Sequence, residues 1–522
     1  MKRKFVPVAL AAVMAFNMAA CNGGGGPTDP ATTPADPGTS DPGASAPADP
    51  GTEDPGTEPE DVEPYTVRTK ADGSPIDLGG MEIIIRDWFS NADTDFMHAD
   101  PDTISSYESE IREYREWAME KYNFKLKQVG GADWGGCIND FVNYVTTGGG
   151  DIEYEYEAGV PEKCSNVIFT LRDDATTTAA MRNNEMYDLS TLDCLDFSEY
   201  KYQRNLCHDQ YSYKGGIYAF YGSISEPRDG VYFNKKLLED GGHTADEIYD
   251  MQKNGTWTWD AFESICKDVQ KDTDNDGTVD VAGWTANTGG SVMAWIYSNG
   301  GELVGRDSSG KYVLKVQDQA TMNALEFANR MIKEYRHKDP QVQGEDGTMQ
   351  DAPWDYYKDS WKNGDAVFLL EQEYAGTPGN FLADISFDAG FVMMPCGPDK
   401  ADKQLVNCWA NNPAVIPACY SPEQAWNIAF AYDVWFDVPP EIEEENGIVS
   451  RARSGIFDQR ALDETLPMMS EPAHGMITYG GMIPDLATGP DLIWGINGDA
   501  KVSEAVDAIV DSWQAYVDAA NQ

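Results

Sequence analysis

Residues 81–129 read MEIIIRDWFSNADTDFMHADPDTISSYESEIREYREWAMEKYNFKLKQV and contain the order strand, helix, strand. Residues 81–86 are a short apolar run, which is typical of a buried strand. Residues 104–122 place their larger apolar side chains near one face of a helix, and residues 124–129 alternate like a strand. A helix between two strands predicts a βαβ unit with parallel strands.

The same alternation continues through the rest of the chain. Apolar runs predict further strands at residues 216–220, 230–233, 366–370 and 387–394. Amphipathic patterns predict helices at residues 138–145, 258–270, 318–336, 421–436 and 502–519. No short internal repeat is visible, so a repeat protein is not indicated. From about residue 75 the chain therefore reads as α/β, with largely parallel sheets.

The composition excludes several classes of function. The chain has 522 residues, with 38 Lys+Arg against 88 Asp+Glu and a formal charge of −50. Binding to nucleic acid needs a basic surface, so this balance argues against it, and it argues equally against a polybasic membrane-surface protein. Beyond the first 20 positions no run of 18 apolar residues occurs, so we expect no transmembrane helix in the mature chain.

Residues 1–20 have the pattern of a secretory signal peptide, with a basic start followed by an apolar run. The run ends in Met18-Ala19-Ala20-Cys21, which resembles the bacterial lipobox, with Met18 in the place where Leu is usual. This resemblance implies that Cys21 becomes the lipidated N-terminus. The alternative is an ordinary signal peptide followed by a chance cysteine.

Residues 21–64 are rich in Pro, Gly, Asp, Glu, Thr and Ala and contain almost nothing that a core would bury. Such a segment cannot offset the entropy lost on ordering. We therefore expect a disordered acidic tether between a lipid anchor and the folded body.

Several short motifs between residues 216 and 417 follow one another in a characteristic order. They read GIYA at 216–219, GVYFNKKLL at 230–238, NGTWTWDAF at 254–262, KDTDNDGTVD at 271–280, AGW at 282–284, WKNGDAVF at 361–368, and a strand before Met394 that is followed by VIP at 415–417. In this order they resemble the extracellular solute-binding proteins of sugar ABC transporters (family 1). The resemblance covers most of residues 80–520.

The resemblance implies a type II periplasmic-binding-protein-like clamp of two lobes, each a mostly parallel sheet flanked by helices. Lobe 1 is expected to contain residues 75–225 and 392–438, and lobe 2 residues 230–390 and 440–522. Crossings near residues 221–230, 388–395 and 437–447 are expected to act as hinges. A small ligand in the cleft would then hold the lobes together, which is hinge closure.

The loop at residues 272–280 is a candidate calcium site. Asp272, Asp274, Asp276 and Asp280 place carboxylates around a Gly turn, and Thr278 offers a backbone carbonyl. Ca²⁺ takes 6–8 hard oxygen ligands, and this loop supplies several of them. It is not an EF-hand, because Gly283 stands where the twelfth-position Glu is needed. The alternative is a solvated Asp/Gly turn.

Aromatic and polar side chains just after strands or in Gly-rich loops are the candidates for sugar binding, because ligand sites in α/β proteins lie there. Sugar rings have apolar C–H faces that stack on aromatic planes, although most aromatic residues of any protein are core. The candidates are Trp88, Trp134, Tyr221, Glu226, Arg228, Trp284, Trp295, Glu373, Tyr374, Trp409, Asn411 and Asn412.

Enzyme motifs are absent or incomplete. Residues 305–311 have Walker A spacing, but Tyr312 replaces the Ser or Thr that would bind Mg²⁺, so a hairpin turn is favoured. No pair of carboxylates stands out for glycosidase chemistry. Eight cysteines follow Cys21; Cys194 with Cys207, and Cys408 with Cys396 or Cys419, are possible disulfides, and buried free thiols are the alternative.

The prediction is an extracytoplasmic substrate-binding lipoprotein that captures a carbohydrate, in particular an oligosaccharide, for an ABC importer. It is not expected to be an enzyme or to need a catalytic cofactor, and it is expected to be a monomer. The candidate ion is a structural Ca²⁺. Its expected partners are the carbohydrate ligand and ABC permease subunits, and its place is the outer face of a bacterial cell membrane, held by the N-terminal lipid only. The alternatives are a surface glycan-active enzyme (glycosidase or lyase) and a transporter-independent glycan sensor or retention protein.

Overall fold

The computed structural model describes most of residues 63–522, which form one structural unit. The first 62 residues lie outside this description, and with them the predicted signal peptide, Cys21 and nearly all of the tether. Also outside it are residues 89–95, 98, 102–103, 105, 173–174, 204–205, 223–227, 344–346, 377–381, 383–384, 408–411, 441, 443–457, 478, 484–485, 487–491, 493–494 and 497–500. Among the described residues, no helix combines the length and the hydropathy that a membrane span requires.

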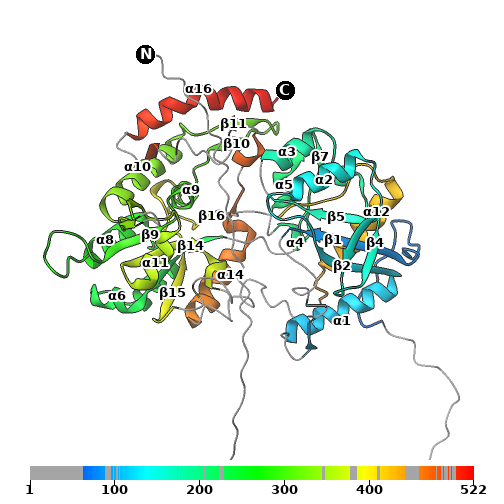
Figure 1. Cartoon of the computed structure of the whole chain (residues 1–522), viewed down its shortest axis with the longest axis horizontal. Coiled ribbons are helices and arrows are strands. Elements are labelled where there is room, and N and C mark those ends of the chain that lie inside the picture. Colours follow the sequence, from blue (N-terminus) through cyan, green and yellow to red (C-terminus); the bar gives the residue numbers. More distant parts are fainter. Residues whose placement is uncertain are drawn as a thin grey trace, which may run out of the picture. The chain divides into compact units, whose positions relative to one another are not determined.

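The first sheet of the described chain has the strand order β17-β5-β1-β2 (Figure 1). Its strands are β1 (Met81–Asp87), β2 (Phe124–Gly130), β5 (Val167–Thr170) and β17 (Ala414–Val415). β1 is parallel to both β2 and β5, as the βαβ prediction required, whereas β17 is antiparallel to β5. The three isoleucines at the centre of β1 are buried, which explains the apolar run at this position.

The second sheet has the order β15-β8-β14-β9. Its strands are β8 (Asp229–Asn234), β9 (Ala282–Ala286), β14 (Ala366–Gln372) and β15 (Ala389–Met393). β14 is parallel to β9, and β8 is antiparallel to both of its neighbours, β14 and β15. All six residues of β8 are buried, which is expected of a central strand with neighbours on both sides.

In each of these two described sheets, one strand runs against the other three. The reversed strands are β17 and β8. Each is the first strand of its sheet after the chain has crossed from the other sheet. Residues 221–228 lead into β8, and residues 394–413 lead into β17. The prediction of mostly parallel sheets therefore holds for strand direction. However, β8 is central, so two of the three pairings in the second sheet are antiparallel.

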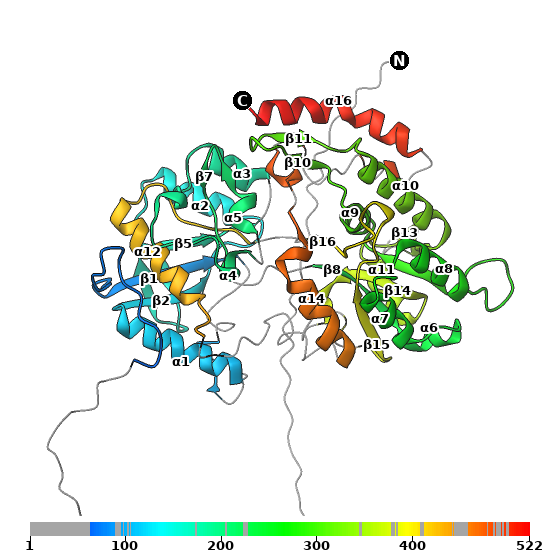
Figure 2. The ribbon, with the colours of Figure 1, turned by 180° about the vertical axis from the view of Figure 1, so that it is seen from behind.

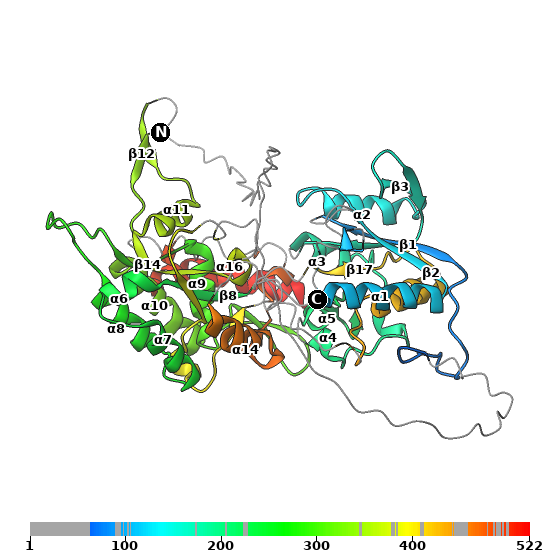
Figure 3. The ribbon, with the colours of Figure 1, turned by 90° about the horizontal axis from the view of Figure 1, so that it is seen from below.

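Helices flank both sheets. In the first sheet α1 and α12 lie against one face and α2 and α3 against the other (Figures 1 and 3). In the second sheet α8 and α11 pack against β9, α6 contacts β8 and β14, and α7 contacts β15 (Figure 2). The helices are α1 (Ser106–Lys121), α2 (Cys137–Thr146), α3 (Ala175–Arg182), α4 (Tyr200–Gln203), α5 (Cys207–Gln210), α6 (Lys235–Asp240), α7 (Ala245–Lys253), α8 (Trp259–Val269), α9 (Thr288–Ser298), α10 (Gln319–Glu334), α11 (Tyr356–Asn363), α12 (Pro422–Trp435), α14 (Leu466–Ser470) and α16 (Val502–Ala520).

Short strand pairs lie outside the two sheets. They are β3 (Ile152–Glu155) with β4 (Pro161–Cys164), β6 (Ser212–Tyr213) with β7 (Gly216–Ile217), β10 (Val304–Arg306) with β11 (Tyr312–Leu314), β12 (Gln341–Gln343) with β13 (Met349–Asp351), and β16 (Val406–Asn407) with β18 (Gly475–Met476). β10 and β11 form an antiparallel hairpin around residues 307–311, so the incomplete Walker A pattern is a hairpin turn, as predicted.

Side-chain caps explain where several helices begin. The hydroxyls of Thr244, Thr258 and Ser421 each accept a hydrogen bond from the backbone N–H three residues later, at α7, α8 and α12. Such caps satisfy N–H groups that have no partner inside the helix. α11 ends at Gly364, whose φ of 83° is in the left-handed region that Gly adopts without strain.

A strap of residues 63–70 holds the start of the described chain against the helices of the first sheet. Glu63 pairs with Lys121, and the indole Nε1 of Trp117 donates to Glu63 at 3.0 Å. The Tyr65 ring meets the Trp117 ring edge-on at 5.1 Å. The backbone N–H of Arg68 donates to the Tyr122 hydroxyl at 2.9 Å. Contacts of three kinds therefore fasten the strap along α1 and the turn that follows it.

The seven cysteines that the structure describes are free thiols, so the disulfide between Cys194 and Cys207 does not form. Cys396 and Cys419 are free as well, and Cys408 lies outside the described residues. Most of these thiols are buried, which agrees with the alternative of free thiols in a large core.

Candidate functional site

The carboxyl edge of the first sheet gathers several predicted residues. β1 ends at Asp87 and leads to the half-buried Trp88, and β2 ends at Gly130 and leads into the loop that carries Trp134. The two strand ends are joined, because the N–H of Gly131 donates to the Asp87 carbonyl at 2.6 Å. Parallel strands end at the same edge, so Trp88 and the Trp134 loop emerge together.

Arg172 holds the Trp134 loop in place. It follows β5 by two residues, and its guanidinium lies 4.1 Å from the centre of the Trp134 ring. Its Nη1 also donates to the Trp134 carbonyl at 2.7 Å. A guanidinium over an indole face is a favourable cation–π contact. The pair therefore sets an indole and a cationic hydrogen-bond donor side by side at the edge of the sheet.

Asn412 reaches the same edge from the crossing segment. The N–H of Leu171, just after β5, donates to the Pro413 carbonyl at 2.8 Å, which places Asn412 beside the end of β5. Asn412 has a φ of 41°, and its Oδ1 is buried without a hydrogen-bond partner among the described residues. A buried amide oxygen of this kind is a group that a ligand hydroxyl would satisfy.

The carboxyl edge of the second sheet carries Arg228 and Glu373. Asp229, the first residue of β8, faces Gln372, the last residue of β14, so Arg228 and Glu373 are neighbours. The Arg228 N–H donates to the Glu373 carboxylate, and the Glu373 N–H donates to the Arg228 carbonyl at 3.0 Å. The Arg228 guanidinium donates to the Met469 carbonyl. Both side chains are almost fully buried, so they fix the crossing segment to β14.

Trp284 and Trp295 lie in the core of the second sheet. Both are 0% exposed, and their rings meet edge-on at 6.2 Å, with Phe327 next to Trp295 at 5.1 Å. The Trp284 Nε1 donates to the Met331 carbonyl at 3.2 Å. Protein atoms thus surround both rings, and this packing favours the core role for them. Tyr221 is half-buried at the start of the crossing segment, next to Gly222, whose N–H faces the Tyr432 hydroxyl at 3.4 Å.

Four of the predicted residues cannot be placed. Glu226, Trp409 and Asn411 lie outside the described residues, and so does the side chain of Tyr374. The structure therefore brings together Trp88, Trp134 and Asn412 at one edge, and Arg228 with Glu373 at the other.

The acidic loop brings three of its predicted ligands together. The carboxylate oxygens of Asp272, Asp274 and Asp276 lie within 4.8 Å of one another, and all three residues are exposed. These carboxylates also accept backbone N–H groups, for example from Gly277 to Asp272 at 2.9 Å and from Thr278 to Asp276 at 2.7 Å. Asp280 instead accepts hydrogen bonds from the Thr273 hydroxyl and N–H, which hold the pKa of Asp280 below its usual value.

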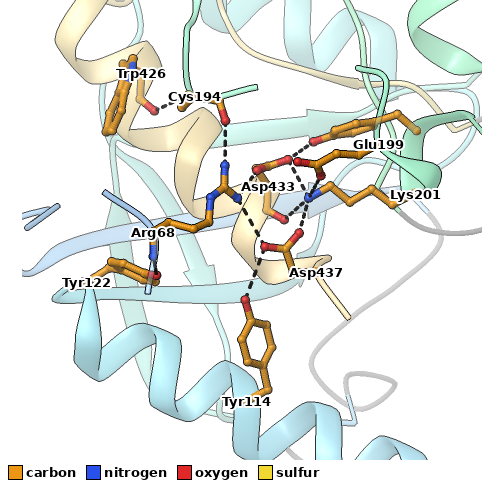
Figure 4. Close-up of polar contacts among 10 residues, drawn as sticks. Arg68, Tyr114, Tyr122, Cys194, Glu199, Lys201, Trp426, Asp433 and Asp437 are labelled. Atoms are coloured by element: carbon orange, nitrogen blue, oxygen red, sulfur yellow. Dashed lines mark hydrogen bonds and ion pairs between the residues drawn. The ribbon is translucent and has the colours of Figure 1, made fainter. Parts of the chain in front are cut away.

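A second group of carboxylates, Glu199, Asp433 and Asp437, is already occupied by cations (Figure 4). The Lys201 Nζ lies 3.0 Å from Glu199 and pairs with Asp437, and Arg68 pairs with Asp433. Burial disfavours the charged form of Lys201, but the carboxylates more than offset this and raise its pKa to about 12. The ammonium therefore stands where a metal ion would be placed, and this group has a structural role.

No family model matches the chain, and no curated protein matches it. Among solved structures, a cyclic α-maltosyl-1,6-maltose binding protein from Arthrobacter globiformis aligns with 84% of this chain and 99% of its own, at a TM-score of 0.55 and 12% identity. A cyclo/maltodextrin-binding protein complexed with maltotetraose covers 84% and 98%, at a TM-score of 0.52 and 12% identity. The chain has the type II solute-binding fold.

The solute-binding fold confirms the predicted fold class. In this fold each four-stranded sheet is the centre of one lobe. The lobe built on the order β17-β5-β1-β2 is called the first lobe, and the lobe built on β15-β8-β14-β9 the second lobe. Both neighbours are binding proteins by their names, not enzymes.

Arg172 is not among the residues predicted from the sequence. It lies just after β5, before the first of the family motifs at residue 216 and where no strand was predicted. The signal that would have found it is the apolar run of β5, because a charged residue two positions after a buried strand lies at a sheet edge.

Proposed function

We propose that this protein captures a carbohydrate outside the cytoplasm and delivers it to an ABC importer. The observation that carries the proposal is the solute-binding fold together with the Trp134–Arg172 pair at the carboxyl edge of the first sheet. The two solved neighbours are named for cyclic α-maltosyl-1,6-maltose and for cyclo/maltodextrin, and at 12% identity they support the fold. The residues at the edge supply the argument for a sugar.

Sugars need two kinds of partner at once, an apolar plane for their C–H faces and polar groups for their hydroxyls. Trp88 and Trp134 supply aromatic surface at the edge, and both are half-buried rather than fully enclosed. The guanidinium of Arg172 and the Oδ1 of Asn412 supply a donor and an acceptor nearby. A mostly apolar site with a few placed polar groups is the usual form of a small-molecule site.

Ligand capture would proceed by hinge closure. A sugar held at the carboxyl edge of one lobe gains further contacts when the other lobe meets it, so ligand shifts the population to the closed state by its differential affinity. The Arg228–Glu373 pair would support this movement. It fixes the end of one crossing segment to β14, so the lobe turns as a rigid body from that point.

The N-terminal features complete the proposal. Cys21 would carry the lipid that anchors the protein to the outer face of the cell membrane, and residues 21–64 would be the spacer. Permease subunits would be separate chains, and the protein would act as a monomer. The Asp272–Asp276 loop would bind Ca²⁺ as a structural ion, because its three carboxylates already lie close together.

A thermal-shift screen against a panel of mono- and oligosaccharides tests the function. We expect one class of sugar to raise the melting temperature through mass action on the native state, and small-angle scattering to show compaction with the same sugar. A binding response without compaction would contradict hinge closure. Release of shortened products from the bound oligosaccharide would contradict a pure binding role and favour the glycan-active enzyme.

A further inference from the structure

Helix α11 points its N-terminal end at the carboxyl edge of the second sheet. The hydroxyl of Tyr357, at the start of α11, donates to the carboxylate of Glu371 near the end of β14 at 2.6 Å. One turn later, the Nε1 of Trp361 donates to the carbonyl of Val367 near the beginning of β14 at 3.3 Å. The helix therefore runs opposite to β14, and residues just before Tyr357 lie beyond the carboxyl end of the strand.

The segment before α11 reaches the same edge from β9. Arg336 forms a parallel bridge with Trp284, the N–H of His337 donates to the Trp284 carbonyl at 2.7 Å, and Arg336 Nη2 donates to the Ala286 carbonyl at 3.3 Å. Since the bridge is parallel, the chain after His337 continues past the carboxyl end of β9. The His337 ring stacks on Tyr356 at 6.4 Å, which joins the two segments.

The β12–β13 hairpin and Trp354 occupy the chain between these two fixed points. Figure 3 shows β12 extending beyond α11. Trp354 is 58% exposed, and it is the single exposed tryptophan among the described residues. The ammonium of Lys358, one turn into α11, lies 5.6 Å from the centre of its ring. An exposed indole with an ammonium beside it thus stands near the carboxyl edge of the second sheet.

We propose that Trp354 and Lys358 form an additional sugar-binding subsite, which contacts a distal unit of a carbohydrate chain. The inference rests on the proposed function and extends it, because a ligand that also reaches Trp354 is longer than one that contacts only the carboxyl edge of the first sheet, the central site. Trp354 supplies the plane on which a sugar ring stacks, and Lys358 donates to its hydroxyls. The pair repeats the combination of Trp134 and Arg172 at the edge of the first lobe.

The test uses the full-length protein and defined probes. Affinity electrophoresis with starch, xylan, mannan, laminarin, pectin and dextran identifies the polysaccharide that the wild-type protein binds, and calorimetry gives the affinities for that polysaccharide and for the disaccharide that it contains. Trp354→Ala should weaken polysaccharide binding by roughly tenfold, within the range of one aromatic stacking contact. Disaccharide binding should stay within about twofold, since the central site alone accounts for it.

Two further variants control the result. Trp354→Phe keeps an aromatic plane and should retain most of the affinity. Met349→Ala removes another exposed apolar side chain of the hairpin, 62% exposed, without removing a ring, and should leave both affinities unchanged. The melting curves of all three variants should match that of the wild-type protein, because the changed side chains are exposed.

The possible failures are distinguishable. If the wild-type protein binds none of these polysaccharides and none of their disaccharides, the proposed function is contradicted and the inference falls with it. If the wild-type protein binds but Trp354→Ala leaves the polysaccharide affinity unchanged, or weakens both probes equally, the additional subsite is wrong and the proposed function stands.

Discussion

The Nζ of Lys201 lies 2.8 Å from the Oδ1 of Asp433, a carboxylate that solvent does not reach. The same carboxylate accepts hydrogen bonds from the Tyr202 hydroxyl and from Arg68 (Figure 4). Burial opposes the ionisation of Asp433, but Lys201 and Arg68 outweigh it and hold its pKa below the usual value. Asp433 thereby joins the strap, α4 and α12 in one charged network.

Replacing Asp433 with Ala should destabilise the protein strongly. The change leaves the ammonium of Lys201 and the guanidinium of Arg68 without their shared buried partner, and such a loss costs about 3–5 kcal/mol. Reversible chemical denaturation measures the free energy of unfolding. As a control, Glu153→Ala removes the exposed pair with Lys163 at 2.7 Å and should leave the free energy of unfolding almost unchanged. Equal losses in both variants would contradict the role of the network.

The contribution of Asp433 should depend on pH in one direction. Its pKa in the folded protein is depressed, so its ionised form stabilises the fold fully above the unfolded value of about 3.9, and this stabilisation is lost as the pH falls through the folded pKa. The difference in unfolding free energy between wild type and Asp433→Asn should be constant near neutral pH and shrink in acid. A difference that grows in acid would mean that the pKa is raised instead.

Trp134→Ala and Trp295→Ala should behave in opposite ways. Trp134 is half-buried at the sheet edge, so its loss should weaken sugar binding by roughly 1–3 kcal/mol, a range taken from stacking on nucleic-acid bases. Trp295 is fully buried, so its loss should cost about 3–5 kcal/mol of stability while the folded fraction binds normally. Melting curves and calorimetric affinities of both variants separate the two roles. A destabilised Trp134→Ala with native affinity would remove Trp134 from the site.

Calcium should raise the melting temperature of the wild-type protein, because an ion that binds the native state stabilises it. The double substitution Asp274→Asn with Asp276→Asn should abolish this response and leave the melting curve in EDTA unchanged. Asp280→Asn is the matched control, since Asp280 bonds to Thr273 and stands apart from the three clustered carboxylates. Identical curves with Ca²⁺ and with EDTA in the wild-type protein would rule out the calcium site.

Cys21→Ser should release the protein into the medium or leave its precursor uncleaved, because acylation needs the thiol. Fractionation of cells that express each form, followed by mass determination of the mature chain, checks this. A serine variant that is processed normally and stays with the membrane would contradict the lipobox reading and favour another means of attachment.

The secondary structure was predictable because the core positions of this chain repeat with clear periods. The buried isoleucines of β1 and the amphipathic faces of α8 and α10 stand where the apolar pattern placed them. The reversed direction of β8 was not predictable from its sequence. An apolar strand reads the same in either direction, and the direction of β8 depends on a crossing that begins in the other sheet.

The candidate site was predictable only in part, and for a similar reason. Local sequence places Trp134 in a loop after a strand, but it does not say that Arg172 will cover its ring from 38 residues away. Trp284 and Trp134 each stand next to a glycine, yet one is core and the other lies at an edge. Which of them is enclosed depends on α8, α9 and α10 packing over one lobe, and such contacts have no signature in a short motif.

The strap at residues 63–70 makes the two lobes mechanically unequal. Glu63 and Arg68 fasten the incoming chain to the first lobe, so a pull transmitted along a membrane tether would act on that lobe alone. Under the proposed anchoring and hinge closure, the first lobe would be the fixed frame, and the second lobe would move relative to the cell surface. An importer that meets the protein from the membrane side would therefore sense ligand chiefly through the new position of the second lobe.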